Sequence, residues 1–505
     1  MSAGAVPQQK TQAALRAWPV TERDRLPLAL WSSHEIEKAT GGSASHAFQA
    51  SGVEMDSRDL RPGDLFVALK GEAMDGHRFL PQAFAAGAVA AITDRPVDYP
   101  HVLVKDTTEA LHALAHAARD RSPAVRIGIT GSVGKTGVKE AIFAALDRAS
   151  RGAAHRSVRS YNNHVGVPLS LSRMPARSRF GVFEMGMNHA GEIAPLAAHV
   201  RPDVALITTI APAHIENLGS MEAIADEKAA IFSGLVEGGT AIIPADTDYT
   251  ERLIDHARKA GAKVVTFGRH ESADVRLLDA IPIATGGSMI TADLGDARLC
   301  YSIAEPGEHW IANSLGVMAA VRAAGGDLAA GGLALAEMGG LKGRGARFQI
   351  ETRNGGKALL VDESYNANPA SMRATLRQLG QTPAMRRVAI LGSMMELGDF
   401  SARFHRQLAE PLEEAKVDHA ILVGDEMAVL AAELRRQLGK ADDDQLGMSG
   451  GFTHCDSPAE AIAKLREYGI NGGDAILVKG SNSVGLGALV SHFTQTPPVA
   501  GQRDD

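Results

Sequence analysis

Short apolar segments that alternate with helical segments limit the fold of this 505-residue chain more than any other feature. From about residue 123 onward, candidate buried strands lie at 125–129, 181–185, 204–208, 241–244 and 263–267. A second series of candidate strands lies at 358–361, 388–391, 420–423 and 475–478. Most of these strands are followed by a loop and a helical pattern, which is typical of parallel βαβ units. The sequence therefore predicts an α/β protein.

The length and the changes of rhythm predict three domains, because a domain takes about 100–200 residues. A small α/β domain is expected at 28–107, a central parallel-sheet domain at 108–347 and a C-terminal Rossmann-like domain at 348–495. Residues 1–27 and 496–505 have no periodicity and are expected to be a loose extension and a loose tail. The glycine-rich stretch 339–345 is interpreted as a hinge.

Composition argues against several classes of protein. The 52 Lys and Arg residues are outnumbered by 59 Asp and Glu, and the net charge of −7 argues against a nucleic-acid partner. No apolar run reaches the ~20 residues of a membrane-spanning helix, and the N-terminus lacks the apolar core of a secretion signal. Cys300 and Cys455 are too few for a disulfide framework or a metal cluster. A cytoplasmic protein without a membrane span is expected.

A candidate phosphate-binding loop follows the strand that ends at Thr130. Its residues are Gly131, Ser132, Val133, Gly134, Lys135 and Thr136, and a helical pattern comes next. The glycines let backbone N–H groups face phosphate oxygens, Lys135 can neutralise the β- and γ-phosphates, and the Thr136 hydroxyl can bind Mg²⁺. The strict pattern G-x-x-x-x-G-K-[ST] is not met, because Ile129 stands at the first glycine position. An ordinary glycine turn before a helix is the alternative interpretation.

Three further polar residues follow later strands. Glu184 comes at the carboxyl end of a core strand, where ligands bind in open α/β sheets, so it is a candidate Mg²⁺ ligand. A surface acid at the start of a loop is the more common case for a lone glutamate. By residue type alone, His214 is typical of a loop histidine and Lys228 of a solvated helix lysine. Their spacing does not decide otherwise.

Several motifs in order resemble the Mur ligase superfamily over residues 30–490 or so. Residues 130–136 match the shorter phosphate-loop form T-G-x-x-G-K-[ST] of that family, which removes the objection at Ile129. Further matching segments are 162–168, 184–186, 213–216, 343–347, 362–369 and 395–398, together with His309 and Asn313. Residues 56–58 and 62–71 look like the uridine-nucleotide domain of the family. Residues 364–369 and 395–398 resemble the branch that adds a dipeptide.

The resemblance implies ATP-dependent amide formation in peptidoglycan precursor synthesis. The terminal carboxylate of a UDP-N-acetylmuramoyl-tripeptide would take the γ-phosphoryl group of ATP, and the amino group of D-alanyl-D-alanine would attack the acyl phosphate. A monomer is expected, with one ligand for each domain. A diaminopimelate- or lysine-adding ligase, or another superfamily member, is the alternative within the family. A nucleotide-binding scaffold that has lost catalysis is the alternative of another class.

The resemblance also implies roles for individual residues. The ATP-binding residues would be Thr130, Gly131, Ser132, Val133, Gly134, Lys135, Thr136, Asn313 and Glu363, and the uridine-nucleotide contacts Ser57 and Arg58. Two Mg²⁺ ions would be held by Thr136 and Glu184, and by His214 and a carbamylated Lys228. The catalytic residues would be Lys135, Asn163, His214, Lys228 and Arg347, with Asn162 and Arg344 as alternatives to Asn163 and Arg347. Carbamylation turns an ammonium that repels Mg²⁺ into an oxygen ligand, and it requires a buried, neutral lysine.

Overall fold

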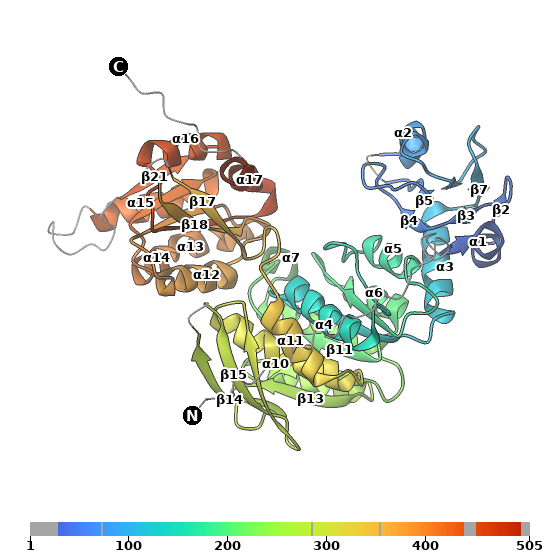
Figure 1. Ribbon diagram of the computed structural model, residues 1–505, viewed down its shortest axis with the longest axis horizontal. Helices are drawn as coiled ribbons and strands as arrows, with labels where there is room; N and C mark the ends of the chain where they lie inside the picture. The colour runs from blue at the N-terminus through green and yellow to red at the C-terminus, as the bar shows by residue number, and fades with distance from the viewer. Residues whose placement is uncertain (1–28, 72–73, 284–285, 353–354, 439–450, 496–505) are drawn as a thin grey trace, which may run out of the picture. The chain divides into compact units, whose positions relative to one another are not determined.

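The computed structural model describes residues 29–71, 74–283, 286–352, 355–438 and 451–495. The expected loose ends at 1–27 and 496–505 lie outside the described residues. The chain divides into two compact units after Ala110. Three main sheets, each with helices, are distributed along the chain (Figure 1), which confirms the predicted α/β class with three domains. The bounds of those domains stay a prediction.

The largest sheet has nine strands in the order β16-β15-β14-β13-β12-β11-β8-β10-β9. Its parallel part consists of β8 (Val125–Thr130), β9 (Ala154–Arg156), β10 (Phe180–Glu184), β11 (Val204–Ile207), β12 (Thr240–Pro244) and β13 (Lys263–Gly268). At its centre, Glu184 of β10 pairs with Ile129 of β8, and Ile207 of β11 pairs with Thr130. The loops that follow these three strands therefore start at the same edge of the sheet.

Helices cover both faces of this sheet (Figure 1). One face carries α4 (Lys135–Ser150), α10 (Glu308–Ala323) and α11 (Leu328–Glu337), which share an apolar cluster with β8 and β11. The other face carries α5 (Gly166–Ser172), α6 (Ile193–Val200), α8 (Met221–Ala229) and α9 (Thr250–Lys259). The short helix α7 (Ile215–Leu218) follows β11. Because both faces are covered, the parallel strands other than β9 are largely apolar, which explains why they could be predicted.

Four strands of the same sheet are absent from the sequence-based expectation: the short parallel strand β9 and the three strands of a meander. β14 (Val275–Pro282), β15 (Ser288–Asp293) and β16 (Arg298–Ile303) form an antiparallel meander that continues the sheet beyond β13. Along β15, Ile290 is fully buried whereas its neighbour Met289 is 38% exposed. Such alternation is expected for strands with one face in water, and it offers no continuous apolar run to recognise.

The C-terminal sheet has six strands in the order β17-β18-β22-β19-β20-β21. The strands are β17 (Ala346–Glu351), β18 (Lys357–Glu363), β19 (Arg386–Gly392), β20 (His419–Val423), β21 (Phe452–Cys455) and β22 (Asp474–Lys479). Its helices are α12 (Pro369–Gln381), α13 (Ser401–Arg406), α14 (Ala409–Glu414), α15 (Ala428–Leu438), α16 (Pro458–Tyr468) and α17 (Gly487–Gln495). Helices α13 and α14 are separate, because Pro411 has no N–H to donate to the preceding turn.

The N-terminal unit contains a five-stranded sheet in the order β2-β7-β6-β5-β4. The strands are β2 (Ser43–Ala44), β4 (Gly52–Glu54), β5 (Asp64–Val67), β6 (Ala90–Thr93) and β7 (His101–Leu103), and only β2 pairs antiparallel. The short strands β1 (Trp31–Ser32) and β3 (Gln49–Ala50) pair separately. The helices are α1 (Ser33–Thr40) and α2 (Leu80–Ala85), and α3 (Thr107–Asp120) spans the division between the units.

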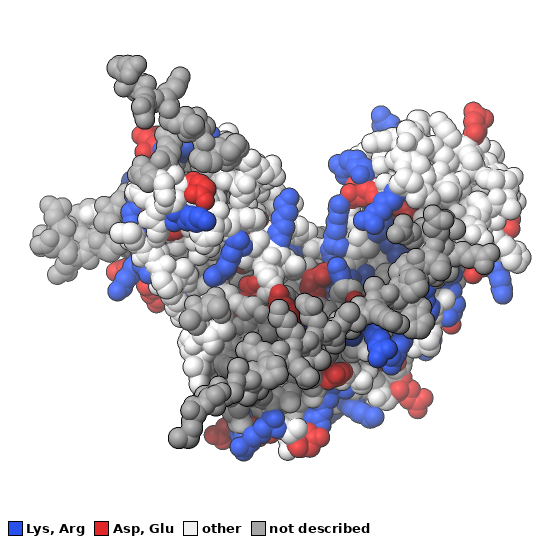
Figure 2. All heavy atoms as spheres, viewed as in Figure 1, with Lys and Arg blue, Asp and Glu red and all other residues white. Residues whose placement is uncertain are grey.

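The surface in Figure 2 shows acidic and basic side chains interspersed among uncharged ones. This mixture agrees with the small net charge of −7. In the described ranges, no helix has the length and apolar character needed to cross a membrane. Cys300 is exposed and Cys455 is buried, and both are free thiols.

Candidate active site

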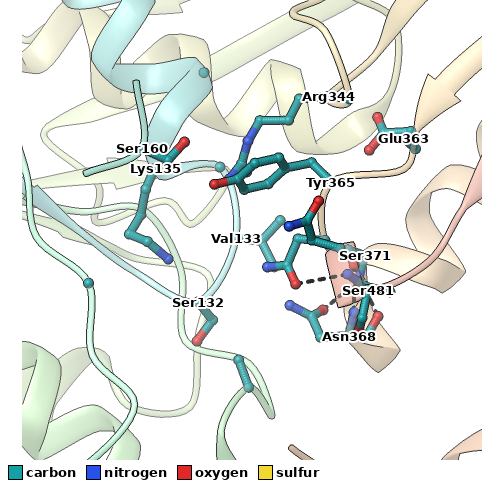
Figure 3. Close-up of a pocket in the computed structure, with 18 of the residues that line it drawn as sticks. Ser132, Val133, Lys135, Ser160, Arg344, Glu363, Tyr365, Asn368, Ser371 and Ser481 are labelled. Carbon is teal, nitrogen blue, oxygen red and sulfur yellow. Dashed lines mark hydrogen bonds between the residues drawn. The ribbon is translucent and has the colours of Figure 1, made fainter. Parts of the chain in front are cut away.

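A cavity of about 570 Å³ brings together residues of the central and C-terminal sheets. Its lining from the central sheet includes Ser132, Val133, Lys135, Ser160, Asn162, Glu184, His214 and Asn313. Its lining from the loop before β17 and from the C-terminal part includes Arg344, Glu363, Tyr365, Asn368, Glu396, Lys479 and Ser481. Figure 3 shows Ser132 and Lys135 on one side of the cavity and Asn368 and Ser481 on the other. The predicted phosphate loop therefore faces a wall made by the C-terminal part.

The loop between β8 and α4 is packed tightly against β11. Gly131 (φ 144°) and Gly134 (φ 88°) adopt backbone conformations that favour glycine. A Cβ at Gly131 would lie 2.0 Å from the Thr208 hydroxyl oxygen, so no side chain fits there. The Ser132 hydroxyl donates a hydrogen bond to the Ala211 carbonyl at 2.8 Å. These contacts fix the N-terminus of α4 at the cavity, where its positive dipole end favours an anion.

Lys135 is the first residue of α4 and lines the cavity. Its ammonium donates a hydrogen bond to the Gly131 carbonyl at 2.7 Å. Burial lowers the pKa of Lys135, and the nearby Glu184 carboxylate opposes that shift. A neutral carbonyl is a weaker partner than a phosphate oxygen, so the ammonium is available to a phosphate in the loop.

Glu184 lies at the carboxyl end of β10 and is fully buried. The Thr136 hydroxyl donates to its Oε2 atom at 2.9 Å, and the Asn162 amide donates to its Oε1 atom at 2.8 Å. Both partners hold the carboxylate in one orientation at the cavity. The hydroxyl of Thr136 and the carboxylate of Glu184 therefore lie side by side, and their joint role in holding a metal ion stays a prediction.

Lys228 on α8 is only 2% exposed, although its residue type suggested a solvated side chain. Its ammonium contacts the Met187 sulfur at 3.9 Å, and a thioether is a weak acceptor. Burial, together with the nearby charge of Lys135, lowers the pKa of Lys228 well below its ordinary value. The side chain is therefore more readily neutral than a surface lysine.

His214 follows β11 and meets Glu396 of the C-terminal part at the cavity. The imidazole Nδ1 atom contacts the Glu396 carboxylate, and this contact lowers the pKa of that carboxyl. Both residues have left-handed backbones, with φ of 58° and 62°. Such conformations cost on the order of 1–3 kcal/mol for residues other than glycine, and they concentrate at functional sites.

The sequence left two pairs of alternatives open, and in each pair the structure places only one residue at the cavity. Asn162 lines the cavity, whereas Asn163 is exposed and its Oδ1 atom accepts a hydrogen bond from the Gly166 N–H at 2.9 Å. Arg344 lines the cavity, where its guanidinium lies 4.2 Å from the centre of the Tyr365 ring. Arg347 is exposed on β17 and is not part of the lining. The geometry therefore favours Asn162 and Arg344 as the cavity residues of each pair.

Two more of the predicted ATP-binding residues, Asn313 and Glu363, lie at the cavity. Asn313 on α10 packs against the phosphate loop, since a Cβ at Gly134 would lie 2.8 Å from its Nδ2 atom. Glu363 ends β18, and its carboxylate lies 3.5 Å from the Lys479 ammonium. Burial lowers the pKa of Lys479, and Glu363 opposes the shift. Asn313 and Glu363 therefore both line the cavity that contains the phosphate loop.

Ser57 and Arg58 belong to the N-terminal unit and are described separately. The Ser57 hydroxyl is buried and donates to the Gln82 side chain at 3.0 Å. The Arg58 side chain is 79% exposed and forms an ion pair with Asp56 at 2.6 Å. Their proposed contacts with a uridine nucleotide remain a prediction.

Sequence reasoning missed several residues that line the cavity. The main ones are Ser160, Glu305, Tyr365, Glu396 and Lys479. Tyr365 and Glu396 lie inside matched motifs and could have been found there, whereas Glu305 lies in a loop with no recognised motif. Only the folded chain places Glu305 beside the C-terminal residues.

The fold and the site define a P-loop nucleotide-binding protein with a C-terminal α/β domain that completes its cavity. The model named Mur ligase family, catalytic domain, matches residues 49–122. The Mur ligase middle domain matches residues 129–321, and the Mur ligase, glutamate ligase domain, matches residues 346–482. The chain belongs to the Mur ligase family, which confirms the resemblance seen in its motifs.

Individual relatives narrow this assignment. The UDP-N-acetylmuramoyl-tripeptide–D-alanyl-D-alanine ligase of Synechocystis sp. is 34% identical over 464 residues, which are 90% of this chain and 94% of the relative. The ligase of the same name from Escherichia coli is 37% identical, over 74% of this chain and 81% of the relative. The crystal structure of MurF from Acinetobacter baumannii has a TM-score of 0.77 at 28% identity, covering 92% of this chain and 99% of that one. MurF ligase from Thermotoga maritima, determined in complex with ADP, has a TM-score of 0.70 at 25% identity, covering 88% and 97% of the two chains.

Proposed function

We propose that this protein is an ATP-dependent ligase that adds D-alanyl-D-alanine to UDP-N-acetylmuramoyl-tripeptide in peptidoglycan precursor synthesis. The observation that carries the proposal is a phosphate loop that shares its cavity with the C-terminal domain, in a chain with full-length relatives of that name. The ADP complex of the Thermotoga maritima relative supports use of ATP in this cavity. A diaminopimelate- or lysine-adding activity is the alternative that the same middle domain would allow.

The proposed reaction suits the positively charged side chains at the cavity. A carboxylate is a poor acyl donor, and transfer of the γ-phosphoryl group converts it into an acyl phosphate with ADP as the leaving group. The amine of D-alanyl-D-alanine then forms the amide bond, phosphate leaves, and the amine loses a proton. Lys135 and Arg344 lie where they can stabilise the charge on the transferring group.

The side chains assigned to Mg²⁺ comprise Glu184 and His214, which line the cavity, and Thr136 and Lys228, which lie behind it. The Thr136 and Glu184 oxygens lie 2.9 Å apart, and Mg²⁺ prefers such hard oxygen ligands. We assign Thr136 and Glu184 to one ion, and His214 and a carbamylated Lys228 to a second. When bound, Mg²⁺ supplies positive charge to the phosphates. No group of three or more His, Cys, Asp and Glu residues within the described ranges is placed to hold a metal by itself.

We also propose one ligand for each domain. Residues 28–107 would bind the uridine nucleotide through Ser57 and Arg58, residues 108–347 would bind ATP, and residues 348–495 would bind D-alanyl-D-alanine. A cytoplasmic monomer fits this role, because the nucleotide substrates are cytoplasmic compounds and one chain contains all three domains.

A phosphate-release assay with the full chain tests the proposed reaction. Release is expected only when ATP, the UDP-tripeptide and D-alanyl-D-alanine are all present, and the new amide is identified by mass spectrometry. Release with diaminopimelate or lysine and a UDP-dipeptide would instead favour the alternative ligase. Binding of ATP without any release would favour a scaffold that has lost catalysis.

The carbamate on Lys228 has a test of its own. The neutral amine would attack CO₂, form an N–C bond and lose a proton, which leaves an anionic carbamate. Protein equilibrated with ¹³C-labelled CO₂ should show one carbamate carbon signal that Lys228→Ala abolishes. Activity of the variant should fall and recover partly with short added carboxylates. A signal that persists in the variant would exclude Lys228 as its site.

A further inference from the structure

Glu305 is a buried acid that faces the cavity without a partner. It lies in the loop between β16 and α10, is 7% exposed and belongs to the cavity lining. Within the described part of the chain, its carboxylate makes no hydrogen bond or ion pair. Buried polar groups nearly always have partners, so an unpartnered one that lines a cavity indicates a ligand contact.

A second carboxylate lies next to it. A Cβ built on Gly345 (φ 93°) would lie 3.4 Å from Glu305 Oε2 and 3.6 Å from Glu363 Oε1. The two carboxylates therefore border the same small space, and the glycine leaves that space open. Burial and the charge of Glu363 raise the pKa of Glu305 to about 7, while Arg347 opposes the shift. Two acids are thus kept close together, and the charges of Arg347 and Lys479 offset the cost only in part.

The position of the pair points to one part of ATP. The Glu305 loop leads directly into α10, whose Trp310 and Asn313 pack against α4 and the phosphate loop. A nucleotide with its phosphates in that loop has its nucleoside within reach of this side of the cavity. Carboxylates repel phosphates and accept hydrogen bonds, so they suit the neutral donors of a nucleoside. Those donors are the ribose hydroxyls and the amino group of adenine.

We propose that Glu305 acts beside Glu363, which the family resemblance already assigns to ATP, so that the two form an acceptor pair for hydrogen-bond donors on the nucleoside half of ATP. The ribose diol matches best, because two adjacent hydroxyl donors meet two neighbouring carboxylates. This inference rests on the proposed function, since it requires ATP in the cavity. Glu305 adds a binding residue in a loop that no motif identified.

Calorimetric titration of the full chain tests the pair directly. The probes are ATP, 2′-deoxy-ATP, 3′-deoxy-ATP and inosine triphosphate, which lacks the amino group. The main variant is Glu305→Leu, which removes both acceptor atoms, and Glu305→Gln keeps one. Glu308→Leu is the matched control, because Glu308 is exposed, pairs with Arg269 and is not part of the cavity lining.

The expected result is selective. Glu305→Leu should bind ATP about 10- to 100-fold more weakly, the value of a hydrogen bond to a charged group. One analogue should already bind weakly to the unaltered protein and lose no further affinity in the variant. A selective loss for a deoxynucleotide places Glu305 on the ribose, and one for inosine triphosphate places it on the adenine amino group. Glu305→Gln should retain part of the affinity, and Glu308→Leu should retain all of it.

Two results would overturn the proposal, and they differ from failure of the proposed function. If Glu305→Leu is folded by circular dichroism and binds all four nucleotides as the unaltered protein does, Glu305 makes no contact. If the affinity for all four nucleotides falls equally in both Glu305 variants, Glu305 supports the structure and accepts no hydrogen bond from the nucleoside. If the unaltered protein binds no ATP at all, the proposed function itself falls, and the acceptor pair falls with it.

Discussion

Lys139 shows how one buried charge can support the site from outside it. The side chain is fully buried one turn along α4 from Lys135. Its ammonium donates to the carbonyls of Ser157 at 3.3 Å and Arg159 at 2.5 Å. The segment held in this way continues to Asn162, which orients the Glu184 carboxylate. We infer that Lys139 is a positioning residue for the predicted metal ligand.

Replacing Lys139 by Met should therefore affect both stability and ligand binding. The carbonyls would lose a charged donor, and Glu140 would keep only its ion pair with Arg156, so the free energy of unfolding should fall by about 3 kcal/mol. Binding of ATP with Mg²⁺ should weaken because Asn162 is no longer held. Urea unfolding and nucleotide titration measure the two effects. Lys357→Met, which removes an exposed ion pair, is the control and should change neither by much. Equal behaviour of the two variants would contradict the positioning role.

The raised pKa of Glu305 should make the stability of the protein depend on pH. Its folded-state pKa of about 7 lies above its ordinary value of 4.5, so ionisation of this carboxyl destabilises the fold. The cost is absent below pH 4.5 or so, grows up to about pH 7 and is constant above it. Glu305→Gln should therefore raise the free energy of unfolding at pH 8 by up to about 3 kcal/mol, and by much less at pH 5. Urea titrations at both pH values check this. An equal effect at the two values would contradict a raised pKa.

Individual residues differ in how far the sequence could predict them. Lys135 and Thr136 were predicted because their roles follow from a local strand–loop–helix pattern. The burial of Lys228 was implied only by the family resemblance and not by its residue type, since it results from packing against residues such as Met187 that lie far away in the chain. Asn162 and Asn163 are adjacent, and the conformation of the folded loop decides which of the two side chains points into the cavity.

At the scale of elements, the packing of α10 on α4 holds the phosphate loop in shape. Gly134 (φ 88°) and Gly152 (φ 84°) flank α4 and have nearly the same positive φ. A Cβ at Gly134 would lie 2.8 Å from the Asn313 amide, whereas one at Gly152 has nothing within 4 Å. A substitution at Gly152 therefore tests the cost of a positive φ alone, and one at Gly134 tests that cost together with a steric clash.

Alanine at each position tests this difference. Gly152→Ala should lower the free energy of unfolding by about 1 kcal/mol from the left-handed backbone alone, with ATP affinity unchanged. Gly134→Ala should cost at least as much and also weaken ATP binding about tenfold or more, because Asn313 is displaced. Thermal unfolding and nucleotide titration measure both. An unchanged ATP affinity in Gly134→Ala would show that Asn313 can move without consequence.

The elements that could be predicted from the sequence are those covered on both faces. The parallel strands β8, β10 and β11 are continuous apolar runs, and their positions were predicted to within a residue or two. The meander β14 to β16 was missed because one of its faces meets water, and the alternating pattern is weaker than a run. The fold class depends on the first group, so it was right without the second.

At the scale of the molecule, the glycine-rich stretch was interpreted as a hinge, and the structure divides it into two parts. Gly343 donates its N–H to the Asp362 carboxylate at 2.8 Å, and the Gly345 N–H donates to the Asp362 carbonyl at 2.8 Å. The second half of the stretch is thus attached to the C-terminal sheet. Any hinge between the central and C-terminal domains is therefore confined to residues close to Gly339 and Gly340.

Closure at this point would protect the acyl phosphate from water. Tyr365 and Met395 line the cavity while 39% and 47% exposed, and closure would bury them. X-ray scattering should therefore give a smaller radius of gyration when a non-hydrolysable ATP analogue and the UDP-tripeptide are bound. Indistinguishable profiles with and without the ligands would rule out the hinge.

The two remaining glycines make this test specific. A Cβ at Gly340 would lie 2.0 Å from the Gly345 carbonyl oxygen, whereas one at Gly339 has nothing within 4 Å. Gly340→Ala must therefore shift the backbone of the hinge, and it should reduce both the ligand-induced contraction and the rate of amide formation. Gly339→Ala should contract as the unaltered protein does, because its new methyl group meets no neighbour. Gly339 and Gly340 belong to the cavity lining, but neither variant removes a side chain from it, so nucleotide affinity should change little. A loss of activity in Gly340→Ala with full contraction would place the effect in the cavity wall and not in domain movement.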